Sequence, residues 1–184
     1  MEYYSIQSHV DCRTLYEGKF ASFTACLEQA VADKIILNNA NLKNRNLANA
    51  CLDDGLFAGA DFSACNLSGA NLSEACMKKA RFINADLYNT CLALGNLKEC
   101  DFTGASFGAT DIAGTNIEAC RFSTLSCFSL NFPRTQEMKD SRFVAPDGTE
   151  CALSSPPPRH SRLIRKYPDP DRQPLDRGKR SFSL

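Results

Sequence analysis

Cysteine is the residue type in this sequence with the most reactive side chain, because its thiolate is both a nucleophile and a metal ligand. Ten cysteines occur among 184 residues, whereas histidine is present only at His9 and His160. A nucleophilic cysteine needs a neighbouring base, and no pattern in the chain brings either histidine beside a core cysteine. The sequence also lacks a paired-cysteine metal motif and a glycine-rich phosphate loop. We therefore expect no enzymatic activity, no metal and no cofactor.

The overall composition restricts where such a protein works. Lys and Arg total 21, as do Asp and Glu, so the formal net charge is zero and no global field favours nucleic acid or an anionic membrane. The N-terminus, residues 1–5, has no basic region followed by an apolar run. No stretch approaches the roughly 18 apolar residues of a membrane helix. We expect a cytoplasmic protein with reduced thiols and no membrane contact.

A five-residue repeat dominates the middle of the chain. A large apolar residue, here called the centre, stands at every fifth position from 37 to 132, with Cys127 as the exception. The position two before the centre is small in sixteen of twenty units, and the residue just before the centre is often Asn or Asp. The exceptions at the small position are Ile35, Arg45, Leu125 and Leu130.

A period of five matches neither a helix of 3.6 residues per turn nor a strand of period two. The pattern instead predicts a backbone that turns a corner every five residues, so that four corners complete a square coil of twenty. Coils would then stack at roughly the 4.8 Å spacing of adjacent strands, with the centre and the small residue both pointing inward. The Asn and Asp side chains would bond neighbouring backbone groups at the bends. Residues twenty apart would stack, and one column contains Leu42, Phe62, Phe82, Phe102 and Phe122.

Units such as Ala60-Asp61-Phe62, Ala70-Asn71-Leu72 and Ala85-Asp86-Leu87 resemble those of the pentapeptide-repeat proteins. This resemblance implies an all-β fold, a right-handed quadrilateral parallel β-helix, and covers residues 34–134, or about five coils. It says little about function, because such a fold supports many different surface sites.

The flanking segments predict caps and a tail. We assign residues 1–33 to an extended lead-in and a capping helix, whose N-cap is Ser22. Residues 135–155 form an irregular C-terminal cap, with a short helix expected over 135–140. Residues 156–184 are rich in proline, carry a net charge of +5 against −5 for the remainder, and are predicted to be a disordered tail.

The repeat stacks two of the cysteines on successive coils. Cys100 and Cys120 occupy the same small position twenty residues apart, so their Cα atoms should lie roughly 5 Å apart, within the range of a disulfide. Two reduced thiols acting as small apolar groups are the reading we favour for a cytoplasmic protein. A redox role is the alternative.

The function that we expect is a non-enzymatic protein-interaction or scaffolding module of bacterial origin, a monomer or weak dimer with an unidentified protein partner. Residues one and two positions after the centres face outward, and one such row is charged. A short basic segment of the tail could dock as a linear motif. The expected partner contacts are Lys78, Lys79, Lys98, Glu99, Glu118, Arg162, Arg165 and Lys166.

Two alternative functions remain. The first is a DNA mimic that binds DNA gyrase or another topoisomerase, and the resemblance implies it, because some pentapeptide-repeat proteins that confer quinolone resistance mimic DNA and bind DNA gyrase. The coils here carry a net charge of only −2 over residues 33–132, far below the charge density of a duplex. The other alternative is a bacterial effector. We expect no direct binding of nucleic acid.

Overall fold

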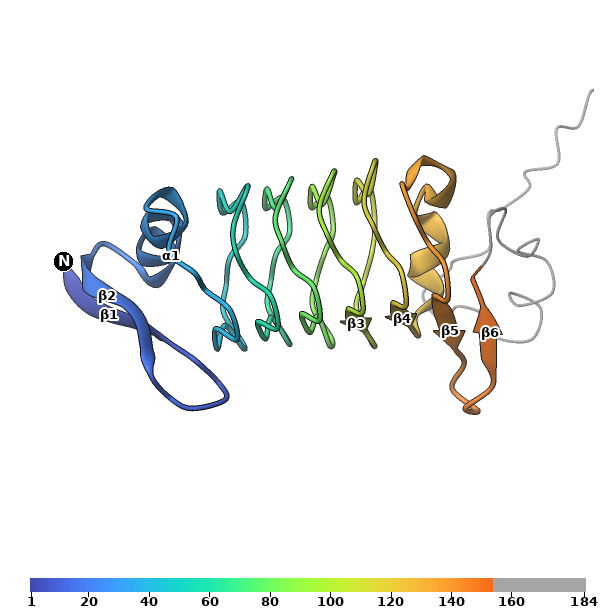
Figure 1. Ribbon diagram of the computed structural model, residues 1–184, viewed down its shortest axis with the longest axis horizontal. Coiled ribbons are helices and arrows are strands. Elements are labelled where there is room, and N and C mark those ends of the chain that lie inside the picture. Colours follow the sequence, from blue (N-terminus) through green and yellow to red (C-terminus); the bar gives the residue numbers. More distant parts are fainter. Residues whose placement is uncertain (154–184) are drawn as a thin grey trace, which may run out of the picture.

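The computed structural model describes residues 1–153. Figure 1 shows a row of stacked coils between a helix-containing unit at the N-terminal end and a small hairpin at the C-terminal end. The predicted tail, residues 156–184, lies outside the described residues, as do its contact residues Arg162, Arg165 and Lys166. No helix within residues 1–153 is long and apolar enough to cross a membrane.

Successive coils pair through parallel bridges between residues twenty apart. Bridges at Asn41↔Asp61, Asn46↔Asn66, Cys51↔Asn71 and Leu56↔Cys76 mark the four sides of one coil. The sides are short because the chain turns again within five residues. Only Asp101–Phe102 (β3) and Arg121–Phe122 (β4) extend to two-residue strands, which pair in parallel. The chain is therefore a β-helix solenoid with a twenty-residue coil, as the period predicts.

Most corners are closed by a hydrogen-bonded tight turn. The amide of Ala40 donates to the carbonyl of Leu37 (3.1 Å) three residues earlier, and the intervening Asn39 has a φ of 60°. A positive φ at the third residue of a four-residue turn is typical of type II turns and favours Gly and Asn. The Asx residue before the centre also braces the bend, since Asp61 Oδ1 accepts from the Ser63 amide (3.0 Å). The prediction that these side chains bond the backbone at the bends is confirmed.

The interior is filled by the centres of the repeat, all twenty of which are buried. The predicted phenylalanine column is confirmed. The rings of Phe62, Phe82, Phe102 and Phe122 stack with centroids 5.0–5.1 Å apart and interplanar angles of 2–9°. Such offset stacks are favourable aromatic pairs, and a spacing near 5 Å follows from the separation of adjacent strands.

A hairpin and a helix cover the N-terminal end of the coil. Strands β1 (Glu2–Gln7) and β2 (Thr14–Phe20) pair in antiparallel fashion, so the expected extended lead-in is a hairpin. Helix α1 (Phe23–Ala32) has Ser22 as its N-cap, as predicted, and the Ser22 side chain accepts from the Ala25 amide. The hairpin joins the first coil through the Asn41 amide, which donates to the Gln7 carbonyl at 2.7 Å.

The C-terminal end differs from expectation. Two 3₁₀ helices, Leu125–Ser129 and Phe132–Arg134, interrupt the coil. The ladder then resumes with one extra residue, since Glu137 pairs with Asn116, and β5 (Arg142–Val144) pairs in parallel with β4. Strand β6 (Glu150–Ala152) completes a hairpin with β5. The short helix expected over 135–140 is therefore wrong, because the backbone there pairs with the preceding coil.

Candidate functional site

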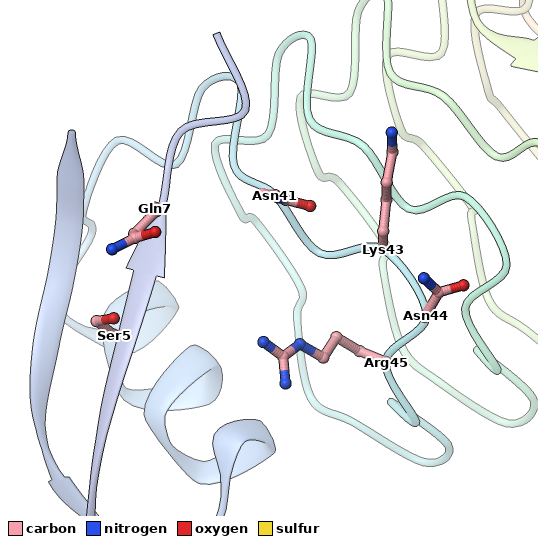
Figure 2. A pocket seen from close by; sticks show the side chains of 6 residues that line it. All are labelled: Ser5, Gln7, Asn41, Lys43, Asn44 and Arg45. Atoms are coloured by element: carbon pink, nitrogen blue, oxygen red, sulfur yellow. The ribbon is translucent and has the colours of Figure 1, made fainter. Parts of the chain in front are cut away.

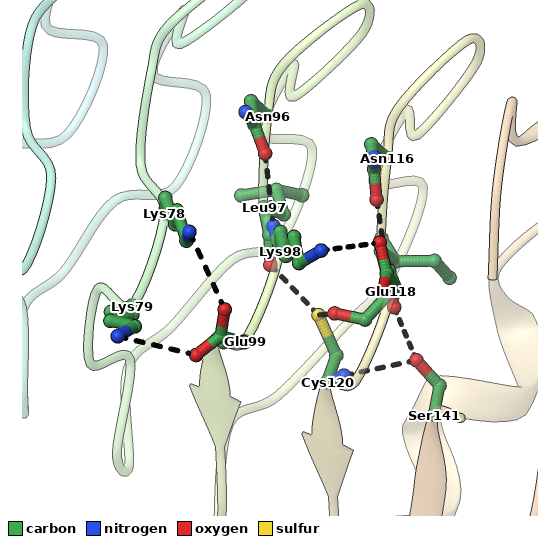
Figure 3. Close-up of polar contacts among 11 residues, drawn as sticks. Lys78, Lys79, Asn96, Leu97, Lys98, Glu99, Asn116, Glu118, Cys120 and Ser141 are labelled. Atoms are coloured by element: carbon green, nitrogen blue, oxygen red, sulfur yellow. Dashed lines mark hydrogen bonds and ion pairs between the residues drawn. The ribbon is translucent and has the colours of Figure 1, made fainter. Parts of the chain in front are cut away.

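The charged row predicted from the sequence lies along one side of the coil (Figure 3). Lys78, Lys98 and Glu118 each follow a buried centre, and Lys79 and Glu99 come one position later. The twenty-residue coil therefore brings these five residues together on three successive coils. We call these five residues the charged row.

The charges of this row pair with one another from coil to coil. Lys78 Nζ and Lys79 Nζ lie 3.6 and 3.5 Å from the carboxylate oxygens of Glu99, and Lys98 Nζ lies 2.8 Å from Glu118 Oε2. The side chains are between 24% and 63% exposed. The row is thus a partly exposed ladder of ion pairs rather than a set of isolated charges.

The pairing shifts two ionisation equilibria. The hydrogen bond to Glu118 raises the pKa of Lys98 and outweighs the opposing desolvation. Desolvation acts to raise the pKa of Glu99, but the attraction of Lys79 and Lys78 is stronger and the pKa is lowered. Both shifts favour the charged forms of Lys98 and Glu99. Such a row can recognise a complementary charge pattern.

Asp61 is a buried carboxylate with two cationic partners, whereas the sequence pattern predicts only that it bonds the backbone at a corner. Its side chain is fully buried, and its Oδ2 lies 3.2 Å from Lys43 Nζ and 3.4 Å from Arg81 Nη1 on the neighbouring coils. Desolvation opposes the charge, yet hydrogen bonds from Ser63 and the two cations outweigh it and lower the pKa of Asp61. The alternation of Asp61, Arg81, Asp101 and Arg121 at twenty-residue steps was a sequence signal for the pair of Asp61 with Arg81, but not for the pair with Lys43.

The stacked cysteines are buried free thiols. Cys100 Sγ donates to the Met77 carbonyl (3.0 Å) and Cys120 Sγ to the Leu97 carbonyl (2.8 Å), each 23 residues earlier. Thr90 makes the same contact with the Leu67 carbonyl, so Cys and Thr are interchangeable small donors at this position. Burial raises the pKa of Cys100 well above its ordinary value. The thiolate needed for redox chemistry is therefore disfavoured there.

The remaining candidate groups have structural partners. His9 Nε2 lies 2.9 Å from the Gly59 carbonyl oxygen and so links the N-terminal hairpin to the second coil. Among residues 1–153, no group of three or more His, Cys, Asp and Glu side chains is placed to hold a metal ion.

A hollow lies between β1 and the first coil (Figure 2). It has a volume of about 310 Å³ and a polar lining made of Ser5, Gln7, Asn41, Lys43, Asn44 and Arg45. Nothing in the repeat pattern predicts it, because it depends on where the hairpin sits.

Comparisons with known proteins bear on the repeat. The family model for pentapeptide repeats matches eight copies over residues 56–93. No curated protein matches the chain in sequence.

Several solved structures resemble the chain at low sequence identity. One is a pentapeptide repeat protein from the thylakoid lumen of Arabidopsis thaliana, with 18% identity over 67% of this chain and 75% of that one, and a TM-score of 0.38. Another is Rfr23 from the cyanobacterium Cyanothece, with 16% identity, 58% and 82% coverage, and a TM-score of 0.27. A third is QnrB1, a plasmid-mediated fluoroquinolone resistance protein, with 15% identity, 58% and 73% coverage, and a TM-score of 0.25.

The matched repeats are part of an uninterrupted series of five-residue units. Their buried centres, tight corners and bridges between residues twenty apart all follow the repeat. Together with the match to the family model over residues 56–93, these features show that the coil of this chain is built from pentapeptide repeats.

Proposed function

We propose that this protein is a non-enzymatic interaction or scaffolding module, built on a right-handed quadrilateral β-helix, and that the charged row is its contact surface for a protein partner. The observation that carries this proposal is the row itself, in which five charged side chains are held at fixed spacing on three successive coils. The proposal places the protein in the bacterial cytoplasm, as a monomer or weak dimer.

The backbone under the row is rigidly held, which favours selective binding. The Lys79 amide donates to the Lys98 carbonyl, and the Glu99 amide donates to the Glu118 carbonyl, both at 2.8 Å. A partner therefore meets a preorganised surface and spends little free energy on ordering it. A fixed pattern of both charge signs contributes more to partner selection than to raw affinity.

DNA mimicry of a topoisomerase substrate is the second candidate, and the surface charge weighs against it. A mimic needs unpaired negative charge along its outer face. Several coil carboxylates are instead neutralised by cations on neighbouring coils, including Asp54 by Lys34, Asp61 by Lys43 and Arg81, and Glu118 by Lys98. An effector role is the third candidate, and it has no structural feature in its favour.

The test is affinity capture with charge-reversed variants of the full-length protein. Lys78→Glu combined with Lys79→Glu should abolish capture of the partner, because both substitutions place like charges beside Glu99. Lys34→Glu is the matched control. Lys34 shares the positive φ of Lys79 and also pairs with a carboxylate one coil on, Asp54 at 2.6 Å. Equal capture by both variants would contradict the proposal.

Two further arms separate the alternatives. Removal of residues 156–184 should leave capture of the partner unchanged. If the truncated protein no longer captures the partner, recognition would be assigned to Arg162, Arg165 and Lys166. A gyrase supercoiling assay, run with and without a fluoroquinolone, should show no effect of micromolar protein. Inhibition or protection would favour DNA mimicry instead.

A further inference from the structure

The hollow between β1 and the first coil is lined entirely by side chains that can donate hydrogen bonds. Ser5 and Gln7 come from the hairpin, and Asn41, Lys43, Asn44 and Arg45 come from the first coil (Figure 2). No carboxylate is part of this lining. A cavity with this composition suits a ligand that offers acceptors and negative charge.

Arg45 is the unusual residue of the set. It occupies a position that is small and buried in most other units, such as Ala60 and Ala80. In the first coil no further coil lies on the N-terminal side, so the side chain is exposed and extends toward the hairpin (Figure 2). Its guanidinium carbon lies 4.0 Å from the ring centroid of Phe23. This stacking orients the guanidinium group while its N–H edge stays available for a planar acceptor.

The charge around the hollow is positive. Lys43 leaves the same turn in a different direction from Arg45 (Figure 2), and its Nζ lies 3.2 Å from the buried Asp61, which Arg81 approaches from the other side at 3.4 Å. One carboxylate is thus shared by two cations. The ion pairs within residues 1–153 do not involve Arg45.

The hairpin side adds one carboxylate to this balance. Glu17 lies opposite Ser5 in the strand register and interacts with the Tyr3 hydroxyl. It is not part of the lining of the hollow. The charged side chains of the lining itself are Lys43, which pairs with Asp61, and Arg45.

We propose that this hollow is a binding site for a small oxyanion, a carboxylate or a phosphate, with Arg45 as the main contact. The amide groups of Gln7, Asn41 and Asn44 supply further donors, and Lys43 supplies a second positive charge. A volume of about 310 Å³ corresponds to roughly ten water molecules at about 30 Å³ each. This size accommodates inorganic phosphate or a short dicarboxylate together with hydration water, and the site is independent of the charged row.

The test is a titration of the full-length, ¹⁵N-labelled protein followed by NMR, with inorganic phosphate in one arm and succinate in the other, at constant ionic strength. Saturable shifts of the side-chain amides of Gln7, Asn41 and Asn44 are expected in at least one arm. The arm that saturates at lower concentration identifies the oxyanion. Shifts that rise linearly without saturation in both arms would overturn the proposal.

Variants of Arg45 distinguish a built site from general attraction to a basic surface. Arg45→Gln should weaken binding at least about tenfold, since a charge-assisted hydrogen bond contributes about 1.5–3 kcal/mol. Arg45→Lys keeps the charge without the planar guanidinium group, so its affinity should lie between those of the wild type and Arg45→Gln. Lys79→Gln removes an exposed cation from the charged row and should bind like the wild type. Equal weakening by Lys79→Gln and Arg45→Gln would overturn the proposal, as would unchanged binding by Arg45→Gln.

Discussion

The interior and the exterior of this coil use the same twenty-residue spacing for opposite purposes. Inside, the phenylalanine column from Phe62 to Phe122 stacks at 5.0–5.1 Å and is almost completely buried. Outside, the charged row pairs Lys with Glu at 2.8–3.6 Å, and its side chains remain partly hydrated. Burying a large apolar side chain stabilises a fold by about 1.5–3 kcal/mol, whereas an exposed ion pair contributes about 0–1 kcal/mol.

This difference separates stability from recognition. Because the column holds the coils together, the side chains on the outer face can change with little effect on the fold. The outer face can therefore specialise in binding, and the solenoid acts as a rigid support for it. Substitutions in the column and in the charged row test this division of roles.

The largest effect is expected from Phe82→Ala in the middle of the column. Loss of a fully buried ring that stacks on Phe62 and Phe102 should lower the free energy of unfolding by about 3–5 kcal/mol, because a cavity remains between rigid coils. Urea unfolding followed by circular dichroism measures the change. Phe82→Leu is the matched control, since Leu42 occupies the same column, and it should cost much less. A loss below about 1 kcal/mol for Phe82→Ala would contradict the role of the column.

Asp61→Asn should have the next largest effect, about 1–2 kcal/mol at neutral pH. Asn can still accept from the Ser63 amide at the bend, but Lys43 and Arg81 lose their shared carboxylate. Urea unfolding at pH 7 measures this cost. Lys34→Gln, which breaks an exposed pair with Asp54, is the control and should cost less than Asp61→Asn.

The same carboxylate gives a pH dependence with a defined sign. The folded pKa of Asp61 lies below its ordinary value of 3.8, so the unfolded chain binds the proton more readily. Its contribution is complete above the unfolded pKa and is lost as the pH falls through the folded pKa. The difference between wild type and Asp61→Asn should therefore shrink as the pH falls below about 4. A difference that grows on acidification would contradict this assignment.

The sequence predicts the regular part of the fold well, because every unit repeats the same pattern of residue types. A large centre, a small partner and an Asx bend recur at a constant period, so the column and the corners could be located before the structure was known. The C-terminal continuation could not be located in this way. One extra residue within the segment of the two 3₁₀ helices shifts the period, and Glu137 and Arg142 then pair across 21 residues instead of twenty.

The charged row and the hollow beside Arg45 also differ in how far the sequence predicts them. The charged row could be predicted because its members follow the repeat, and its Lys79 and Glu99 are twenty residues apart. The hollow beside Arg45 could not, because it depends on how the hairpin packs on the first coil. Only the exception that Arg45 makes to the small-residue rule gave any indication of it.

Cys100 tests how much the hydrogen bond of a buried polar group contributes to the stability of the interior. Cys100→Ala removes the donor to the Met77 carbonyl and should cost about 0.5–1.5 kcal/mol, whereas Cys100→Ser keeps a donor and should cost less. Stability measured by urea unfolding compares the two. The interior thiol should also react slowly with a thiol reagent in the native state, and all ten cysteines should titrate after unfolding without reductant. Fewer than ten would indicate a disulfide and revive a redox role.

The smallest effect on stability is expected from the charged row. A double-mutant cycle with Lys98→Gln and Glu118→Gln should give a coupling free energy below about 1 kcal/mol, and this coupling should decrease with added salt because the pair is partly exposed. Urea unfolding of the four proteins at low and high salt provides the measurement. A coupling above about 2 kcal/mol would mean that the row holds the coils together, and its charges would then need no partner to explain them. A small coupling leaves the pairing with little structural value, and recognition becomes the stronger reason for five charges at this spacing.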